Sequence, residues 1–452
     1  MKSTYYHNPK RMLIIFLTGC LAIITPFLLQ NILQVNQFTS IIAVFVIILA
    51  LADPRWGIVA MVASLAIIEV LPDIPLASSA SALLGAVTFA SYLFHVFIRR
   101  ALPLPQKLER GFWLGAILLA WIFLSNPSAA LLLGDRVWIW TLVQLWLVAW
   151  LARNLITDPT TTKLLAIFFI LANLLSVYIV FQQGYIGDSL YQSQRGYGLG
   201  LGSNGTARYL ILSLLFTYYL YITSAQKRPI VSLFYAACGL ILTLGVIYTV
   251  SRTGLILILL AIGLILISPS TKSNGKKLGF LLLGFVGISF FVPTNALRLI
   301  ETILPSIISG TDTAGLRYAL WTAGMKMLSD FPITGVGIGQ FQYALPQYGA
   351  GLVPSFYLNL TAHSMYVQLL AETGIVGLFL FSVMLVLAVK NLYLRILSKD
   401  RDQAMTAWVW FSLVVIILVG ALTKTDFTEK LLWIGLGIGF ASISKSNEVG
   451  NP

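Results

Sequence analysis

The chain has 452 residues, of which 58% are hydrophobic and only 10% are charged, and its formal net charge is +13. Soluble domains carry about 25% charged residues and about 45–50% apolar ones, whereas the mean hydropathy of this chain is +0.88. This composition excludes an ordinary soluble protein. It predicts an all-α, polytopic integral membrane protein.

Apolar runs recur along the chain at the length that crosses a bilayer, which is about 20 residues. Read between charged or Pro/Gly-rich breaks, they predict about 12–14 transmembrane helices. The predicted spans lie near 12–30, 38–52, 57–71, 77–98, 112–124, 137–152, 163–183, 204–223, 229–249, 253–269, 278–293, 364–389, 404–422 and 430–444. The short runs at 112–124 and 430–444 are also compatible with re-entrant or interfacial segments.

The distribution of basic residues predicts the orientation. Lysine and arginine concentrate in cytoplasmic loops, and with both termini in the cytoplasm most of the 29 lysines and arginines fall on that side. This distribution explains most of the net charge without a nucleic-acid partner. The cations left on the periplasmic side are Arg136, Arg195, Arg208, Arg252, Arg298, Arg317, Lys326, Lys424 and Lys430.

Four regions follow from this topology. Residues 1–183 hold the N-terminal transmembrane helices, and 184–293 hold central helices with a first arginine-bearing periplasmic loop. A large periplasmic loop occupies 294–363, and 364–452 contain the C-terminal transmembrane helices and a short cytoplasmic tail. Only the large loop is long enough to contain folded elements of its own.

Within the large loop, "GLRYALWTAGMKMLSDF" has apolar residues at helical spacing. Leu316, Leu320, Met327 and Leu328 fall near one side, which predicts an amphipathic helix lying on the outer membrane surface. The helix should end before Pro332, because proline and the glycines that follow cannot continue it. An irregular loop is expected after that point.

Several chemical motifs can be set aside on their location. "DRD" at 400–402 has the spacing of a metal- and nucleotide-sugar-binding pair, but it falls in a charged cytoplasmic loop and is interpreted as a solvated segment. The three histidines stand alone, at positions 7, 95 and 363, so they form no metal-ligand cluster. We therefore expect no metal and no cofactor.

Four ionisable residues remain as candidates for chemistry on the periplasmic side. They are Arg195, Arg252, Arg317 and His363. Each also has a purely structural interpretation. Arg195 fits an ordinary loop charge, Arg252 can extend to the lipid headgroups, Arg317 can anchor a surface helix, and His363 can cap a helix.

His363 stands just ahead of an apolar helix. If the helix begins there, one face carries Tyr366, Val367, Leu370, Gly374 and Gly377. The two glycines would let a neighbouring helix approach closely and fix the direction of the histidine. Glu372 falls on the opposite face, so it should not orient His363 directly.

Four motifs together resemble the O-antigen ligase and polymerase superfamily. From His363, "HSMYVQLLAETGIVG" fits the family pattern H-[NSQ]-x9-G-x2-[GTY]. "RGYGLGLGSNGTARYL" resembles the family's arginine–glycine–asparagine stretch, and "SRTGLILILL" resembles its Ser-Arg turn. "LRYALWTAGMKMLSDFPITGVGIGQF" is similar to its R-x3-W…P-x2-G-x-G-x-G-x-F segment.

The resemblance implies metal-independent glycosyl transfer on the periplasmic face of a bacterial inner membrane. The donor would be a glycan on undecaprenyl pyrophosphate. Arg195, Arg252 and, less strongly, Arg317 could bind the pyrophosphate, since guanidinium groups pair with phosphate bidentately. His363 would accept a proton from the acceptor hydroxyl or only position that hydroxyl. Nearby arginines should lower its pKa and keep it neutral.

The sequence leaves the acceptor open. An O-antigen ligase would transfer the glycan to the lipid A core. A polymerase of O-antigen or exopolysaccharide would use the same donor and a lipid-linked glycan acceptor. A lipid or polysaccharide transporter is an alternative of another class. It would need ionisable residues along a membrane path, for which Glu69 and Glu372 are the candidates.

Overall fold

The computed structural model describes residues 45–67, 80–105, 107, 109–125, 133–184, 198, 202–224, 229–269, 274–291, 313–425 and 427–441. In these residues the chain forms helices and no strand, which confirms the predicted all-α fold. Five described helices are long and apolar enough to cross a membrane, and shorter apolar helices accompany them. The predicted span at 12–30 lies outside the described residues.

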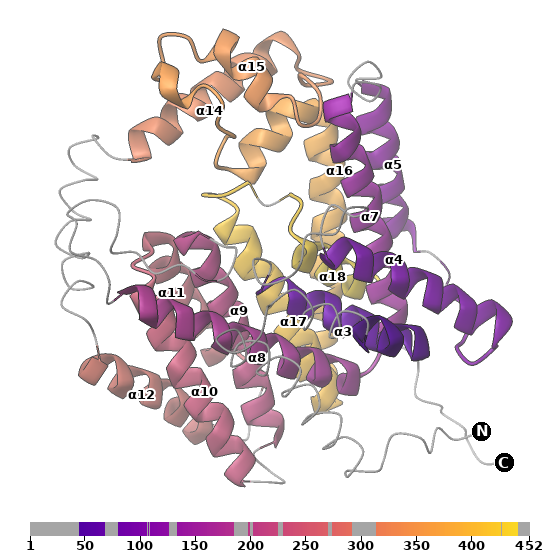
Figure 1. Ribbon diagram of the computed structural model, residues 1–452, viewed down its shortest axis with the longest axis vertical. Helices are drawn as coiled ribbons and strands as arrows, with labels where there is room; N and C mark the ends of the chain where they lie inside the picture. The colour runs from indigo at the N-terminus through magenta and orange to yellow at the C-terminus, as the bar shows by residue number, and fades with distance from the viewer. Residues whose placement is uncertain are drawn as a thin grey trace, which may run out of the picture.

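The helices follow one another along the whole described chain (Figure 1). They are α3 (Pro54–Ser64), α4 (Ala80–Leu93), η3 (Phe94–Ile98), α5 (Arg110–Ser125), α7 (Leu133–Leu155), α8 (Pro159–Gly184), α9 (Ser203–Ser224), α10 (Pro229–Tyr248), α11 (Arg252–Leu266), α12 (Asn274–Phe291), α14 (Thr313–Asp330), α15 (Phe341–Tyr348), η4 (Ser355–Tyr357), α16 (Met365–Ile396), α17 (Arg401–Gly420) and α18 (Lys430–Gly439).

Helix α9 forms the centre of one side of the bundle. It packs against α8, α10, α11 and α17, and nearly all of its residues are buried. Hydrophobic residues on every face of α9 explain this position, because an all-apolar helix is stable only where protein or lipid surrounds it. Helices α5, α7, α16 and α18 pack together on the other side.

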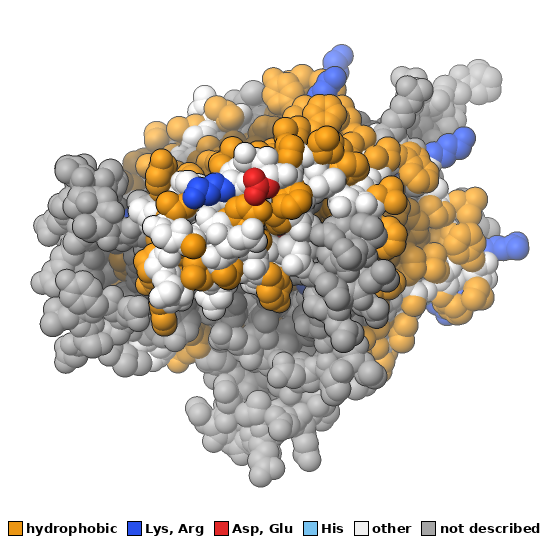
Figure 2. Space-filling view, turned by 90° about the horizontal axis from the view of Figure 1, so that it is seen from above, with side chains coloured by type: hydrophobic (Ala, Val, Ile, Leu, Met, Phe, Trp, Pro, Cys, Tyr) orange, Lys and Arg blue, Asp and Glu red, His pale blue; other side chains and the backbone are white. Residues whose placement is uncertain are grey.

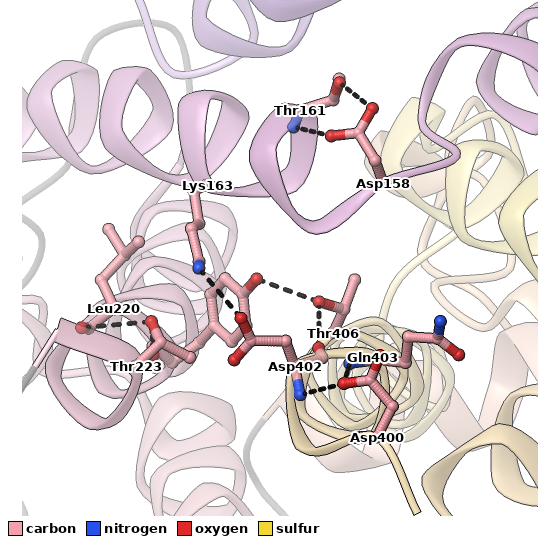
Figure 3. A network of polar contacts seen from close by, with 10 residues as sticks. Asp158, Thr161, Lys163, Leu220, Thr223, Asp400, Asp402, Gln403 and Thr406 are labelled. Atoms are coloured by element: carbon pink, nitrogen blue, oxygen red, sulfur yellow. Dashed lines mark hydrogen bonds and ion pairs between the residues drawn. The ribbon is translucent and has the colours of Figure 1, made fainter. Parts of the chain in front are cut away.

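Where α8 and α17 begin, helix caps and polar contacts hold the chain (Figure 3). Asp158, just ahead of α8, accepts hydrogen bonds from the backbone N–H and hydroxyl of Thr161. Asp402 lies 3.8 Å from the ammonium of Lys163, and the hydroxyls of Tyr219 and Thr406 are hydrogen-bonded at 3.0 Å.

The "DRD" segment has a structural function at this end. Asp400 is the N-cap of α17, and its carboxylate accepts hydrogen bonds from the backbone N–H groups of Asp402 and Gln403. A carboxylate at this position satisfies N–H groups that have no partner inside the helix. The segment is therefore a helix start instead of the expected loop, and both of its aspartates are exposed.

Helices α14 and α15 stand above one end of the bundle (Figure 1). They share a second hydrophobic cluster, in which Leu320, Met327, Phe341 and Leu345 are fully buried. The predicted helix is confirmed and ends at Asp330, directly before Phe331 and Pro332. Its apolar side packs on protein, because α15 and the start of α16 supply apolar partners.

The outward surface of this region has few charges. Viewed from above, hydrophobic and uncharged side chains dominate, with isolated charged groups among them (Figure 2). Tyr318, Met325, Tyr343 and Phe356 are among the exposed large side chains of residues 313–360.

Candidate functional site

His363 lies in a backbone conformation that non-glycine residues seldom adopt. Its φ is +50°, in the left-handed region that costs an L-residue about 1–2 kcal/mol. Ser364 then adopts an extended conformation as the N-cap, and α16 begins at Met365. Such strain persists only where the surrounding structure enforces it, and it concentrates at functional sites.

Both backbone polar groups of Ala362, the residue before His363, are hydrogen-bonded. The backbone N–H of Ala362 donates to Oε1 of Gln368 at 3.2 Å, and its carbonyl accepts a hydrogen bond from Nε1 of Trp321 at 3.1 Å. Gln368 belongs to the first turns of α16 and Trp321 to α14. The turn that carries His363 is thus fixed between these two helices.

The residues after His363 are held by the end of α17 and the loop that follows it. The backbone N–H of Met365 donates to the carbonyls of Ala421 at 2.9 Å and Lys424 at 3.1 Å. The hydroxyl of Tyr366 donates to the carbonyl of Leu418 at 2.9 Å. With the contacts of Ala362, these bonds enforce the strained conformation and fix the path of the backbone.

Helix α16 is broken at Gly374, whose φ is +67°. A Cβ atom there would lie 2.1 Å from the carbonyl oxygen of Ile333. The backbone N–H of Val336 donates to the carbonyl of Ala371, and that of Ile375 donates to the carbonyl of Pro332. The predicted irregular segment after Pro332 is therefore bonded to the break in the helix.

This geometry corrects the expected face of α16. Gly374 makes room for the backbone of residues 333–334 and not for a neighbouring helix, and the Cβ position of Gly377 is taken by the side chain of Thr373. A single straight face from His363 to Gly377 does not form, because the helix changes course at Gly374.

Glu372 holds the outer loop to α16. Its Oε1 accepts hydrogen bonds from the backbone N–H of Phe341 at 3.1 Å and from Nε2 of Gln368 at 2.9 Å. Gln368 also binds Ala362, so Glu372 is connected to the turn of His363 through Gln368. Glu372 is buried in this network. Glu69 lies outside the described residues.

Arg317 is the predicted cation that acts on His363. It lies on α14 and is half-buried. Burial lowers the pKa of His363 below its ordinary value of 6.5, and the positive charge of Arg317 lowers it further. The expectation that an arginine would favour the neutral imidazole agrees with this direction, although burial has the larger effect.

Arg252 lies at the same end of the bundle, where the residues before and after it, Ser251 and Thr253, form hydrogen bonds to other segments. Ser251 caps α11 and donates to Oδ1 of Asn204 at 2.7 Å, which joins the starts of α9 and α11. The hydroxyl of Thr253 is hydrogen-bonded to that of Thr423 at 3.2 Å. Thr423 lies in the loop that also contacts Met365. Arg195 lies outside the described residues.

Two further charged residues enter the site from the loop between α17 and α18. Glu429, the N-cap of α18, forms an ion pair with Arg208 of α9 at 2.9 Å and accepts a hydrogen bond from the hydroxyl of Tyr209 at 2.8 Å. Lys424 lies in the same loop and is half-buried. Arg208 and Lys424 are two of the cations predicted from the sequence to lie on the periplasmic side, although lysine and arginine usually concentrate in cytoplasmic loops.

The described residues contain no group of three or more His, Cys, Asp or Glu that could hold a metal ion. Among the ionisable side chains described at this end, Glu372 and Glu429 accept hydrogen bonds from protein groups, and the others include His363 and several cations. Such a set suits a polyanionic substrate, because guanidinium and ammonium groups bind phosphate strongly.

Comparison with known proteins bears directly on this region. Residues 236–382 match the family model described as O-Antigen ligase. The chain is also 27% identical over 151 residues to the "Exopolysaccharide production protein ExoQ" of Rhizobium meliloti (strain 1021). That similarity spans 31% of this chain and 34% of the relative, so the chain matches about a third of the relative's length.

The fold defines a multi-pass, all-helical membrane protein. The matched residues hold Arg252, Arg317 and His363, and Arg195 precedes them. Over this region the chain is similar to the O-antigen ligase family, which confirms the resemblance seen in the motifs.

Proposed function

We propose that this protein is a glycosyltransferase of the bacterial inner membrane with both termini in the cytoplasm. It transfers a glycan from undecaprenyl pyrophosphate to an acceptor hydroxyl at the periplasmic face. The observation that carries the proposal is the strained, fixed turn at His363, whose imidazole is kept neutral by burial and by Arg317. A base and cations at one membrane boundary suit a lipid-anchored phosphate donor and a hydrophilic acceptor.

The reaction follows from these groups. The acceptor oxygen attacks the anomeric carbon of the glycan, the bond from that carbon to the phosphate oxygen breaks, and undecaprenyl pyrophosphate leaves with the bonding electrons. The proton of the acceptor hydroxyl passes to the neutral imidazole of His363. Arg195, Arg252 and Arg317 bind the pyrophosphate and stabilise the charge that it gains as it leaves.

The acceptor we propose is the lipid A core, which makes the protein an O-antigen ligase. The description of the matching family supports this choice. A second candidate is a polymerase that transfers the glycan to another lipid-linked glycan. The name of the relative, an exopolysaccharide production protein, favours that candidate. Both use the same donor and the same site residues.

The test is transfer from a purified undecaprenyl-pyrophosphate-linked glycan, with a metal chelator present. Lipid A core and lipid-linked glycan are offered as separate acceptors. We expect His363→Ala to lower transfer about 10²–10³-fold, the usual loss when one group that stabilises the transition state is removed. Arg401→Ala, at the start of α17 on the opposite end, should retain activity.

The acceptor that the wild-type protein uses distinguishes ligase from polymerase. Unchanged activity of His363→Ala would remove His363 from the chemistry. A wild-type protein that transfers the glycan only when a divalent metal is supplied would contradict a metal-independent reaction.

A further inference from the structure

Three consecutive apolar residues are exposed directly after α14. Phe331 and Ile333 are 46% and 61% exposed, and Pro332 between them is exposed as well. The residue before them, Asp330, accepts a hydrogen bond from the hydroxyl of Tyr348 of α15 at 2.9 Å. A charged residue tied to α15 is therefore followed at once by an exposed apolar turn, residues 331–333.

The turn 331–333 lies beside the membrane-spanning part of α16. The carbonyl of Pro332 accepts a hydrogen bond from the backbone N–H of Ile375 at 2.9 Å. Ile375 is 58% exposed, and Phe379, one helical turn later, is exposed as well. Helix α16 is long and apolar enough to cross a membrane, and large apolar residues exposed on such a helix face lipid. The turn is therefore level with a lipid-facing residue of α16.

The end of α5 reaches the same level. Nε1 of Trp121 donates a hydrogen bond to the carbonyl of Thr373 at 3.1 Å, two residues before Ile375. Phe123 and Leu124 follow Trp121 and are exposed. Tryptophan is enriched where the bilayer meets water. Exposed apolar residues from α5, from α16 and from the turn 331–333 are thus gathered at one boundary of the bundle.

The backbone of this turn suits an apolar environment. The N–H of Phe331 donates to the carbonyl of Met327 at 3.0 Å, and its carbonyl accepts a hydrogen bond from the N–H of Gly335 at 2.9 Å. Pro332 has no N–H, and its carbonyl is the acceptor for Ile375. A segment that enters hydrocarbon must satisfy its backbone groups within the protein, because lipid tails offer no partners. Phe331 and Pro332 meet this requirement.

Further hydrogen bonds hold the turn at a fixed height on α16. The N–H of Val336 donates to the carbonyl of Ala371 at 2.9 Å, and the N–H of Gly337 donates to the carbonyl of Glu372 at 3.0 Å. The residues that follow the turn are thus bonded to the last residues of α16 before its break. The turn cannot slide along α16 without losing these bonds.

We propose that residues 331–333 enter the bilayer and contact the lipid acyl chains of the leaflet on the side of His363. Lipid is the occupant of this apolar surface, because the surface is continuous with lipid-facing residues of α16 and α5. The sequence predicts that α14 itself lies on the membrane, but its apolar side packs on protein. The turn after the helix makes the contact in its place. The inference concerns the anchoring of the outer region and does not rest on the proposed function.

Spin labels on single cysteines test the surroundings of the turn. In a chain whose Cys20 and Cys238 are replaced by alanine, Phe331→Cys and Ile333→Cys are labelled and placed in nanodiscs of phosphatidylethanolamine and phosphatidylglycerol. Oxygen concentrates in lipid and a nickel chelate stays in water, so the collision rates of a label with the two reagents report its surroundings. We expect both labels to collide more with oxygen than with the nickel chelate, as should a label at Ile375→Cys.

A matched position on α15 is the control. Tyr343 is 64% exposed, close to the value of Ile333, so a difference between their labels reflects the medium and not burial. Tyr343→Cys should collide more with the nickel chelate than with oxygen. A second measurement leaves the sequence unchanged. Wild-type protein in the same nanodiscs is photolabelled with a lipid-soluble aryl diazirine, and mass spectrometry should find insertion at residues 331–333 and at Ile375 but not at Tyr343.

Two other outcomes would overturn the inference. Labels at positions 331 and 333 that meet the nickel chelate as often as the label at 343 would place the turn in water. Labels that collide little with either reagent would show that another part of the protein covers the turn. Glycan transfer is measured separately, so either result would leave the proposed function intact.

Discussion

At the scale of single residues, the proposed reaction depends on the protonation state of one imidazole, that of His363. Burial and the charge of Arg317 both lower the pKa of His363. A lowered pKa extends the neutral, proton-accepting form to more acid pH. The left-handed backbone of His363 is held by Ala362 and Met365. The same turn thus sets both the position of the imidazole and its exposure to solvent.

Replacing Arg317 should move the pH dependence of transfer. In Arg317→Gln one of the two causes of the lowered pKa is lost, so the acid limb of kcat/KM should shift to higher pH but stay below 6.5 because burial remains. Initial rates measured between about pH 5 and about pH 8 would show the shift. Lys326→Gln on the same helix is the matched control. An acid limb at the same pH in wild type and Arg317→Gln would contradict an effect of Arg317 on His363.

At the scale of elements, the outer region and the membrane bundle are joined through the broken helix α16. Gly335 and Gly374 lie where the two backbones meet. A Cβ atom on Gly335 would lie 2.4 Å from the carbonyl carbon of Glu372. Both glycines have positive φ, so only glycine fits without strain. Gln368, which precedes the break in α16, accepts a hydrogen bond from Ala362 in the turn of His363.

Gly374→Ala should therefore loosen the outer region from the bundle. The new methyl group would lie 2.1 Å from the carbonyl oxygen of Ile333 at a φ of +67°, and we expect a loss of about 3 kcal/mol or more in unfolding free energy. Unfolding in detergent, followed by heat, measures it. Gly279→Ala on α12, where no atom lies within 4 Å, should leave stability unchanged or raise it by up to about 1 kcal/mol. Equal stability of the two variants would contradict the close packing at Gly374.

At the scale of the whole molecule, helix ends far apart in sequence meet at two opposite boundaries. The contacts at the end of the bundle that carries His363 involve Asn204, Ser251, Met365 and Thr423. Contacts at the other end involve Lys163 and Asp402. We predict that the first end faces the periplasm, because the positive-inside rule assigns the second to the cytoplasm.

Labelling of single cysteines tests this orientation. In a chain whose Cys20 and Cys238 are replaced by alanine, Tyr343→Cys should react with a membrane-impermeant maleimide in intact cells. Lys399→Cys should react only after the membrane is opened. Both positions are exposed in the structure, so access to each depends on the side of the membrane. Labelling in the reverse pattern would invert the topology and place the proposed reaction in the cytoplasm.

The sequence determined the features that depend on composition and local order. Apolar runs fixed the all-helical membrane class, since a chain inside lipid must satisfy its own backbone hydrogen bonds. Proline and glycine set the end of α14 at Asp330. The motifs around Arg252, Arg317 and His363 lie within residues 236–382, which match the family model.

Only the tertiary structure decided what depends on residues that are distant along the chain. The break at Gly374 exists because residues 332–336 bond to it. Lys424 and Glu429 join the site because the loop between α17 and α18 folds against α9, α11 and the turn of His363. A spacing pattern describes one segment at a time, whereas burial and charge around His363 and Lys424 arise where several segments meet.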